Sequence, residues 1–164
     1  AAARALGELR ASAAVPPLCR RLASGPTVAG AQQPGTPRLQ EPCEALLEAL
    51  GDIGISEPPV LSVIEPFVQH ERPLIRSAAC RALLQLTGEQ RWGEQLVLLL
   101  QHQQLQVRRA ALMDLGAAGW RPALDAIAAT LAENSLKLIA LRGLVEQGDT
   151  DGAQPVLAAM DALL

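Results

Sequence analysis

Apolar positions recur at helical spacing in five stretches of the chain. When the stretches are aligned on a central leucine, apolar residues stand three and four positions before it in each, and such positions share one face of an α-helix. The stretches repeat roughly every 30 to 45 residues, a period typical of stacked helical hairpins. The pattern therefore predicts an all-α solenoid of about five hairpins. Its central leucines are Leu6, Leu50, Leu83, Leu115 and Leu144.

Each of these helices is followed by a break and a second apolar segment. Proline is tolerated in the first turn of a helix, so prolines mark where the second helices begin. The expected starts are Pro16-Pro17, Pro58-Pro59, Trp92, Pro122 and Pro155. Glycine suits the turn between the two helices, because a left-handed residue can end the first one. The glycines assigned to these turns are Gly51, Gly54, Gly88, Gly116, Gly119 and Gly148.

Two stretches depart from the repeat. Residues 25–37, "GPTVAGAQQPGTP", fit neither helix and are expected to form a flexible insertion between the first two hairpins. Pro66 falls within an apolar segment, where it predicts a kink or an early helix end. The remaining pattern is continuous, so we expect one domain over residues 1–164. The chain begins without methionine, apparently inside a helix, and we expect it to be a segment of a longer protein.

Composition and charge exclude several functions. The 14 basic and 17 acidic residues give a net charge of −3, which provides no general attraction to nucleic acid or anionic lipid. The longest unbroken apolar run, Leu96 to Leu100, is far shorter than the roughly 20 residues of a membrane span. The three widely spaced cysteines fit free thiols in a reducing compartment. We therefore expect a cytoplasmic protein that binds no nucleic acid and does not insert into membranes.

Three stretches resemble a known family. The segments "PLIRSAACRALLQL" and "LQVRRAALMDLGAAG" are similar to the HEAT-like repeats named for phycobilisome lyases. The later segment "AENSLKLIALRGLVE", residues 132–146, resembles the E/F-type phycobilin lyases of cyanobacteria. The resemblance covers about residues 42–147 and implies a HEAT-like α-α superhelix.

The resemblance implies that the protein helps to attach an open-chain tetrapyrrole to a cysteine of a phycobiliprotein. The phycobilin would be a substrate and not a permanently bound cofactor, and the nucleophile would be the thiolate of the acceptor subunit. Family members commonly form heterodimers, so a second lyase subunit is an expected partner. The length favours an F-type-like partner or a shortened form of a longer lyase. The alternative is a non-catalytic HEAT-like adaptor that binds a phycobiliprotein or another protein, for example a phycobilisome disassembly factor.

A cation recurs seven positions before the central leucine in three hairpins. A cation near a helix start opposes the dipole of that helix, so dipole stabilisation does not explain Arg76, Arg108 and Lys137. They either pair with an acid of the neighbouring repeat or form a basic ladder that binds propionates or an acidic partner. Arg109 has no cationic counterpart at its offset and is the candidate most specific to this chain.

Scarce aromatic residues and two acids complete the candidate site. Trp92 and Trp120 stand near the starts of second helices, where they either plug the space between repeats or stack on a tetrapyrrole. Asp114 and Asp125 are the candidate catalytic acids that would protonate or fix the pyrrole nitrogens. Both fit solvated helix positions equally well.

Histidine and cysteine provide weaker candidates. His70 and His102 lie in polar turns, where we expect them to be solvated, and no third ligand nearby supports a metal site. Cys80 occupies a core offset. Cys43 and Cys19 lie near predicted helix starts, which would favour a thiolate.

Overall fold

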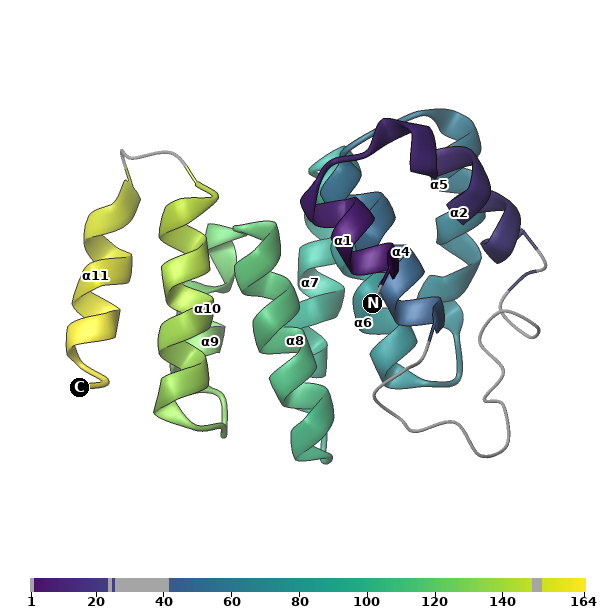
Figure 1. The fold of residues 1–164 in the computed structure, drawn as a ribbon. Helices are drawn as coiled ribbons and strands as arrows, with labels where there is room; N and C mark the ends of the chain where they lie inside the picture. The colour runs from purple at the N-terminus through teal and green to yellow at the C-terminus, as the bar shows by residue number, and fades with distance from the viewer. Residues whose placement is uncertain (1, 24, 26–41, 149–151) are drawn as a thin grey trace. The chain divides into compact units, whose positions relative to one another are not determined.

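The computed structural model describes residues 2–23, 25, 42–148 and 152–164 (Figure 1). Within these residues every regular element is a helix and no strand occurs, which confirms the predicted all-α class. Apart from Gly25, the insertion expected at residues 25–37 lies outside the described residues. No helix in the described part of the chain is long and apolar enough to cross a membrane.

The chain divides into two compact units, Ala1–Glu89 and Gln90–Leu164, and each is described by itself. The expectation of one domain over the whole chain stays a prediction. The first unit contains α1 (Ala2–Glu8), η1 (Ser12–Ala14), α2 (Val15–Leu22), α4 (Pro42–Ile53), α5 (Pro58–Ile64), η3 (Glu65–Gln69) and α6 (Pro73–Thr87). The second unit contains α7 (Gln90–Leu99), α8 (Leu105–Ala118), η4 (Arg121–Ala123), α9 (Leu124–Ala129), α10 (Asn134–Glu146) and α11 (Ala153–Asp161).

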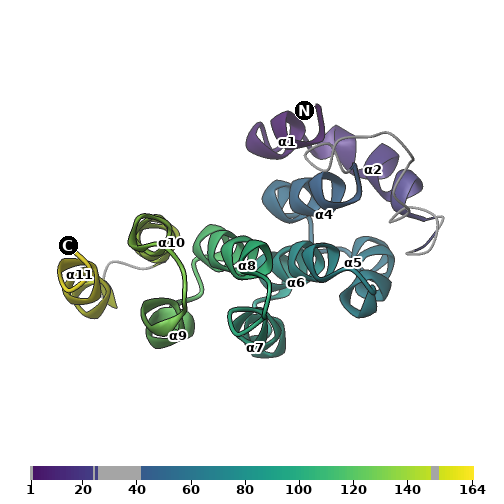
Figure 2. The same cartoon turned by 90° about the horizontal axis from the view of Figure 1, so that it is seen from below.

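In the first unit, α4 lies between α1 and α6, as Figure 2 shows. Leu50 and Leu83 are each 1% exposed, so the repeated leucines of α4 and α6 form the core. Leu6 of α1 is only half-buried. The small residues of the pattern allow the helices to approach closely, since a Cβ at Gly51 would lie 2.9 Å from the Cα of Ala82.

In the second unit, α10 packs along α8. Leu115 and Leu144 are fully buried between the helices, as their offset predicts. The two backbones touch, because a Cβ at Gly116 would lie 2.8 Å from the Cα of Ala140. A Cβ at Gly143 would in turn meet the carbonyl oxygen of Gly116.

The turn glycines divide into two kinds. Gly88 and Gly119 are left-handed residues that end α6 and α8, as predicted, and Gly54 with φ +81° directly follows α4. The turn assignment is wrong for Gly51 and Gly116, which lie inside α4 and α8. At these two positions the missing side chain serves the contact with the next helix, and not a change of chain direction.

The proline-marked helix starts are confirmed. Proline stands in the first turn of α2 and α5, in η4, which precedes α9, and in the first turn of α11. Pro66 has the expected effect, because α5 ends at Ile64 and the chain continues as the 3₁₀ helix η3. The sequence therefore predicts the hairpin boundaries well.

Candidate functional site

The repeated cations bind backbone carbonyls. In Arg76, Nη1 donates to the oxygens of His70 and Glu71, at 3.1 and 3.4 Å. In Lys137, Nζ donates to the oxygen of Ala128 at 2.9 Å. None of the three cations pairs with an acid in the described part of the chain, so the expectation of acid partners was wrong.

Arg108 makes the most extensive of these contacts. Its Nη1 donates to the oxygens of His102 and Gln103, at 2.7 and 2.8 Å. Its Nε donates to the oxygen of Leu131 at 2.8 Å. One guanidinium therefore joins the turn before α8 to the turn before α10.

The position of these carbonyls corrects the dipole argument. Ala128 lies in the last turn of α9, His70 caps the end of η3, and His102 follows α7 by a few residues. Each cation thus lies near the negative end of the preceding helix, although it belongs to the start of the next one. A cation is favourable there, because the last carbonyls of a helix have no partner within it.

The two histidines make the same contact in equivalent turns. The Nδ1 of His70 accepts a hydrogen bond from the backbone N–H of Arg72 at 3.0 Å. The Nδ1 of His102 accepts one from the N–H of Gln104 at 3.1 Å. His70 is only 7% exposed, so the expectation that it is solvated was wrong. Both imidazoles have a turn-forming role.

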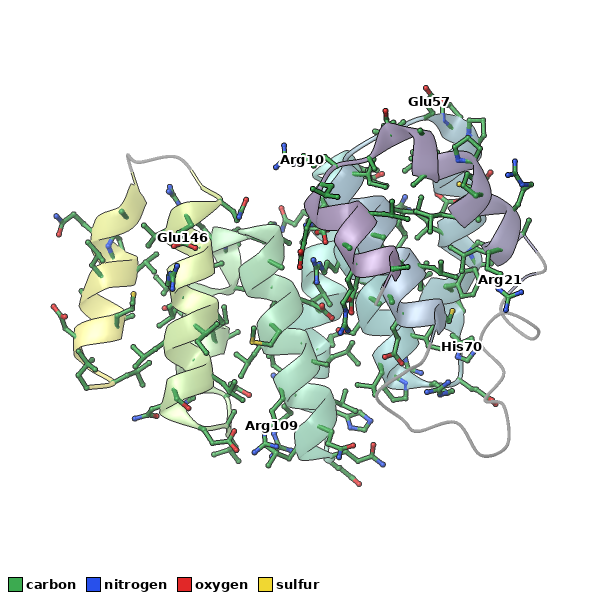
Figure 3. All side chains as sticks on the ribbon, viewed as in Figure 1. Arg10, Arg21, Glu57, His70, Arg109 and Glu146 are labelled. Carbon is green, nitrogen blue, oxygen red and sulfur yellow. The ribbon has the colours of Figure 1, made fainter. Side chains whose placement is uncertain are left out.

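Arg109, in contrast, has an acidic partner. Its Nε donates to Oε2 of Glu133 at 3.1 Å, and its Nη2 binds Oε1 of the same carboxylate. The two side chains are 43% and 42% exposed. Figure 3 shows Arg109 near the beginning of α8, with its side chain directed away from the helix. The pair lies at the surface of the second unit and joins α8 to the residue before α10.

The two tryptophans have different environments. Trp92 is 8% exposed, and the guanidinium carbon of Arg91 lies 4.2 Å from its ring centroid. Trp120 is half-buried and lies on Gly93 of α7, where a Cβ would come within 2.5 Å of the indole ring. Trp92 thus fits the role of a hydrophobic plug, whereas part of Trp120 remains accessible.

The candidates of the second unit are spread along its helices. Arg109 and the last residue of α8, Ala118, are about 14 Å apart along the helix axis, and Trp120 follows two residues later. Asp114 lies between them in the sequence and is 6% exposed, so it is not a solvated helix residue. Asp125 is exposed in the first turn of α9, where the helix dipole favours a carboxylate. Their predicted role as acids is not tested by this arrangement.

All three cysteines are free thiols. Cys80 and Cys43 are each 2% exposed, which confirms the core position of Cys80. Cys19 lies in the middle of α2, and burial raises the pKa of its thiol above the ordinary value. The expectation of a favoured thiolate at Cys19 was therefore wrong. Among the described residues no group of histidine, cysteine and acidic side chains could hold a metal ion.

Three residues at these contacts were missed in the sequence. Gly93 supports Trp120, Gly143 allows α10 to approach α8, and Glu133 binds Arg109. Each of the two glycines stands inside an otherwise apolar helical pattern, a signal of close packing. Glu133 gives no such signal, because an acid before a helix is ordinary.

The fold and these contacts define a HEAT-like helical repeat protein, and the comparisons with known proteins agree. The profile of the PBS lyase HEAT-like repeat matches residues 1–24 and 107–133. The "Bilin biosynthesis protein RpcE" of Synechococcus sp. (strain WH8020) is 58% identical over 132 residues, which are 80% of this chain and 49% of that protein. The "Phycocyanobilin lyase subunit alpha" of Picosynechococcus sp. (strain ATCC 27264 / PCC 7002 / PR-6) is 47% identical over 171 residues, which cover 99% and 62%.

A solved structure gives the same result. It is described as the complex of CpcE and CpcF of phycocyanin lyase from Nostoc sp. PCC7120, and it matches with a TM-score of 0.88 and 45% identity. The match covers 99% of this chain and 61% of that one. The chain belongs to the E/F-type phycobilin lyase family, with PBS lyase HEAT-like repeats. It spans about half to three fifths of the length of these relatives, whose names give no support to the F-type expectation.

Proposed function

We propose that this chain acts as part of the alpha subunit of a phycobilin lyase. It binds an open-chain tetrapyrrole and a phycobiliprotein, and it promotes thioether attachment of the tetrapyrrole to a cysteine of that acceptor. The observation that carries the proposal is the 47% identity to a phycocyanobilin lyase subunit alpha across 99% of this chain. Similarity maintained over both units supports a shared function better than a match to one repeat would.

Thioether formation requires the lyase to bind and orient the bilin, and it requires no nucleophile from the lyase. The thiolate of the acceptor forms a carbon–sulfur bond with the ethylidene group of the bilin, the carbon–carbon double bond becomes a single bond, and a proton is added to the ring. The nucleophile therefore belongs to the acceptor. The buried thiols of Cys43 and Cys80 fit this division, since neither can reach a ligand without local opening. The role of this chain is to orient the bilin and to exclude water.

Among the candidate residues, Arg109 and Trp120 have the most suitable exposure. We assign a propionate contact to Arg109 and a stacking contact to Trp120. An extended tetrapyrrole laid along α8 would meet both, because Arg109 lies in the second turn of that helix and Trp120 lies just beyond its end. Asp114 and Asp125 remain the proposed proton donors, and Trp92 a proposed further contact. Binding of a propionate or a partner by Arg76, Arg108 and Lys137 would have to compete with their backbone contacts.

The proposal includes partners and a compartment. A phycobiliprotein subunit is the acceptor, and a second lyase subunit completes the active form. The CpcE and CpcF complex supports this pairing because one of its chains has the fold of this one. The cytoplasm, where the three thiols would stay free, is the proposed location.

The proposal is tested by co-expression with a second lyase subunit, a bilin source and an apo-phycobiliprotein. We expect a covalently coloured acceptor that fluoresces with zinc in a denaturing gel. An acceptor whose target cysteine is replaced by serine is the control and should stay colourless. Acceptor that is bound but never coloured would contradict the proposal and favour the non-catalytic adaptor.

Arg109 provides a sharper test within the same assay. We expect Arg109→Ala to weaken bilin binding about tenfold while the melting temperature stays nearly unchanged, because exposed ion pairs contribute little to stability. Arg142→Ala is the matched control, since Arg142 forms an exposed pair with Glu146 within α10. A large loss of stability with intact binding would show that Arg109 is an inter-repeat strut.

A further inference from the structure

The pair of Arg109 and Glu133 has a geometry that a free carboxylate could reproduce. Arg109 offers two parallel N–H groups, from Nε and Nη2, to the two oxygens of one carboxylate. This side-on arrangement is the preferred way in which a guanidinium binds any carboxylate, including that of a ligand. The exposed pair of Arg142 and Glu146 differs, because it joins residues of one helix through a 2.6 Å bond from Nε alone.

Glu133 is weakly held at this position. It is the residue before α10, yet its carboxylate makes no capping hydrogen bond to that helix. Its side chain is 42% exposed, and exposed pairs of this kind contribute only about 0.2–1 kcal/mol. The neighbouring backbone is better fixed, because Arg108 binds the oxygen of Leu131 and Thr130 binds the oxygen of Leu100 at 2.8 Å. The carboxylate can therefore leave Arg109 while the turn stays in place.

We propose that Glu133 occupies the carboxylate site of Arg109 in the free protein, and that a propionate of the bilin replaces it on binding. This inference rests on the proposed function. The pair holds the guanidinium extended at the position that a planar carboxylate of a ligand would take. It also imposes competition, so only a ligand with a free carboxylate gains from the exchange. Arg109 thereby favours a free acid over an ester, and Glu133 lowers the affinity for the free acid.

The test is a titration of the chain with phycocyanobilin and with its dimethyl ester. Removing the competing charge in Glu133→Gln should tighten binding of the free acid about 1.4- to 5-fold, the range that corresponds to an exposed pair. Binding of the ester should not change. Arg109→Ala combined with Glu133→Gln should remove the gain, and Glu146→Gln is the matched control that should leave both affinities unchanged.

Chemical modification provides a second measurement. Phenylglyoxal reacts with accessible guanidinium groups, and the modified peptide is identified by mass spectrometry. We expect Arg109 to react faster in Glu133→Gln than in the unaltered chain, and phycocyanobilin to protect it in both. The ester should not protect it.

The outcomes separate this inference from the proposed function. If phycocyanobilin binds but Glu133→Gln leaves its affinity unchanged or weakens it, the exchange is wrong and the lyase function stands. A gain for the ester equal to that for the free acid also overturns the exchange. If neither the unaltered chain nor any variant binds phycocyanobilin, the bilin-binding part of the proposed function fails, and the exchange fails with it.

Discussion

The α4–α6 pair of the first unit and the α8–α10 pair of the second unit solve the same packing problem differently. Between α4 and α6, Asp52 accepts hydrogen bonds from Arg81 at 2.7 Å and from Gln85 at 3.1 Å. Between α8 and α10, backbone meets backbone at Gly116 and Gly143. At the surface of the second unit, the guanidinium of Arg109 is accessible. The first unit therefore has a partly buried polar clasp of Arg81 and Asp52, whereas the second has an exposed ion pair of Arg109 and Glu133.

The largest effect is expected from a methyl group at the glycine contact. In Gly143→Ala the new Cβ would meet the carbonyl oxygen of Gly116, a backbone atom that cannot move without shifting α8. We expect a loss of about 2 kcal/mol in the free energy of unfolding, typical of overpacking and reduced by the better helix propensity of alanine. Urea unfolding followed by circular dichroism measures it.

Gly51→Ala is the matched change in the first unit. Its Cβ would meet the flexible end of Gln85 and, at 2.9 Å, the Cα of Ala82. Because the amide can move aside and the remaining backbone contact is less close than that at Gly143, the expected loss is smaller, about 1 kcal/mol. A loss equal to that of Gly143→Ala would contradict the distinction between the two helix pairs.

An intermediate effect is expected at the polar clasp. The side chains of Arg81 and Asp52 are only 14% and 28% exposed. Arg81→Met should therefore lower the free energy of unfolding by about 1.5–2 kcal/mol, the lower part of the range for a hydrogen bond to a charged group. Arg109→Met should lower it by less than about 0.5 kcal/mol, because its pair is exposed. Equal losses in parallel urea titrations would mean that the two ion pairs contribute equally to the free energy of unfolding.

The smallest effect concerns thiol reactivity, which reports on the first unit alone because all three cysteines lie there. Burial raises the pKa of Cys19, so its thiol stays protonated to a higher pH than a free cysteine does. We expect alkylation by iodoacetamide to be slow at pH 8 and to increase only above the ordinary thiol pKa of about 8.5, because the pKa of Cys19 is raised. Labelling at pH 8 as fast as that of free cysteine would contradict the assigned burial.

Local sequence signals predicted the hairpins, but they failed where packing against a neighbouring helix determines the role of a residue. The prolines and the repeated leucines act within one helix, so their effect is visible in the sequence. Gly51 and Gly116 were placed in turns because glycine ends many helices, and only the position of the adjacent backbone shows their real role. Leu6 follows the repeat but is half-buried, which its offset could not reveal.

The candidate site was predicted less well for a related reason. The repeat showed that Arg76, Arg108 and Lys137 are equivalent, yet their partners are carbonyls, which every residue has and no pattern marks. The burial of His70 was missed because its turn reads as polar. Arg109 was correctly separated from Arg108 by its lack of a counterpart. Its partner Glu133 became visible only when α8 and the start of α10 were placed side by side.

The carbonyl contacts of Arg108 and Lys137 also affect how such a protein is divided into modules. Each cation stands in the first helix of one hairpin, but it completes the end of the hairpin before it. A repeat excised at the loop would lose the cation that caps the end of its second helix. It would keep a cation whose carbonyl partner lies in the preceding repeat. Shuffled or shortened arrays should therefore be joined after the cation, inside the first turns of α8 or α10. The functional module is thus offset from the hairpin by about one turn of helix.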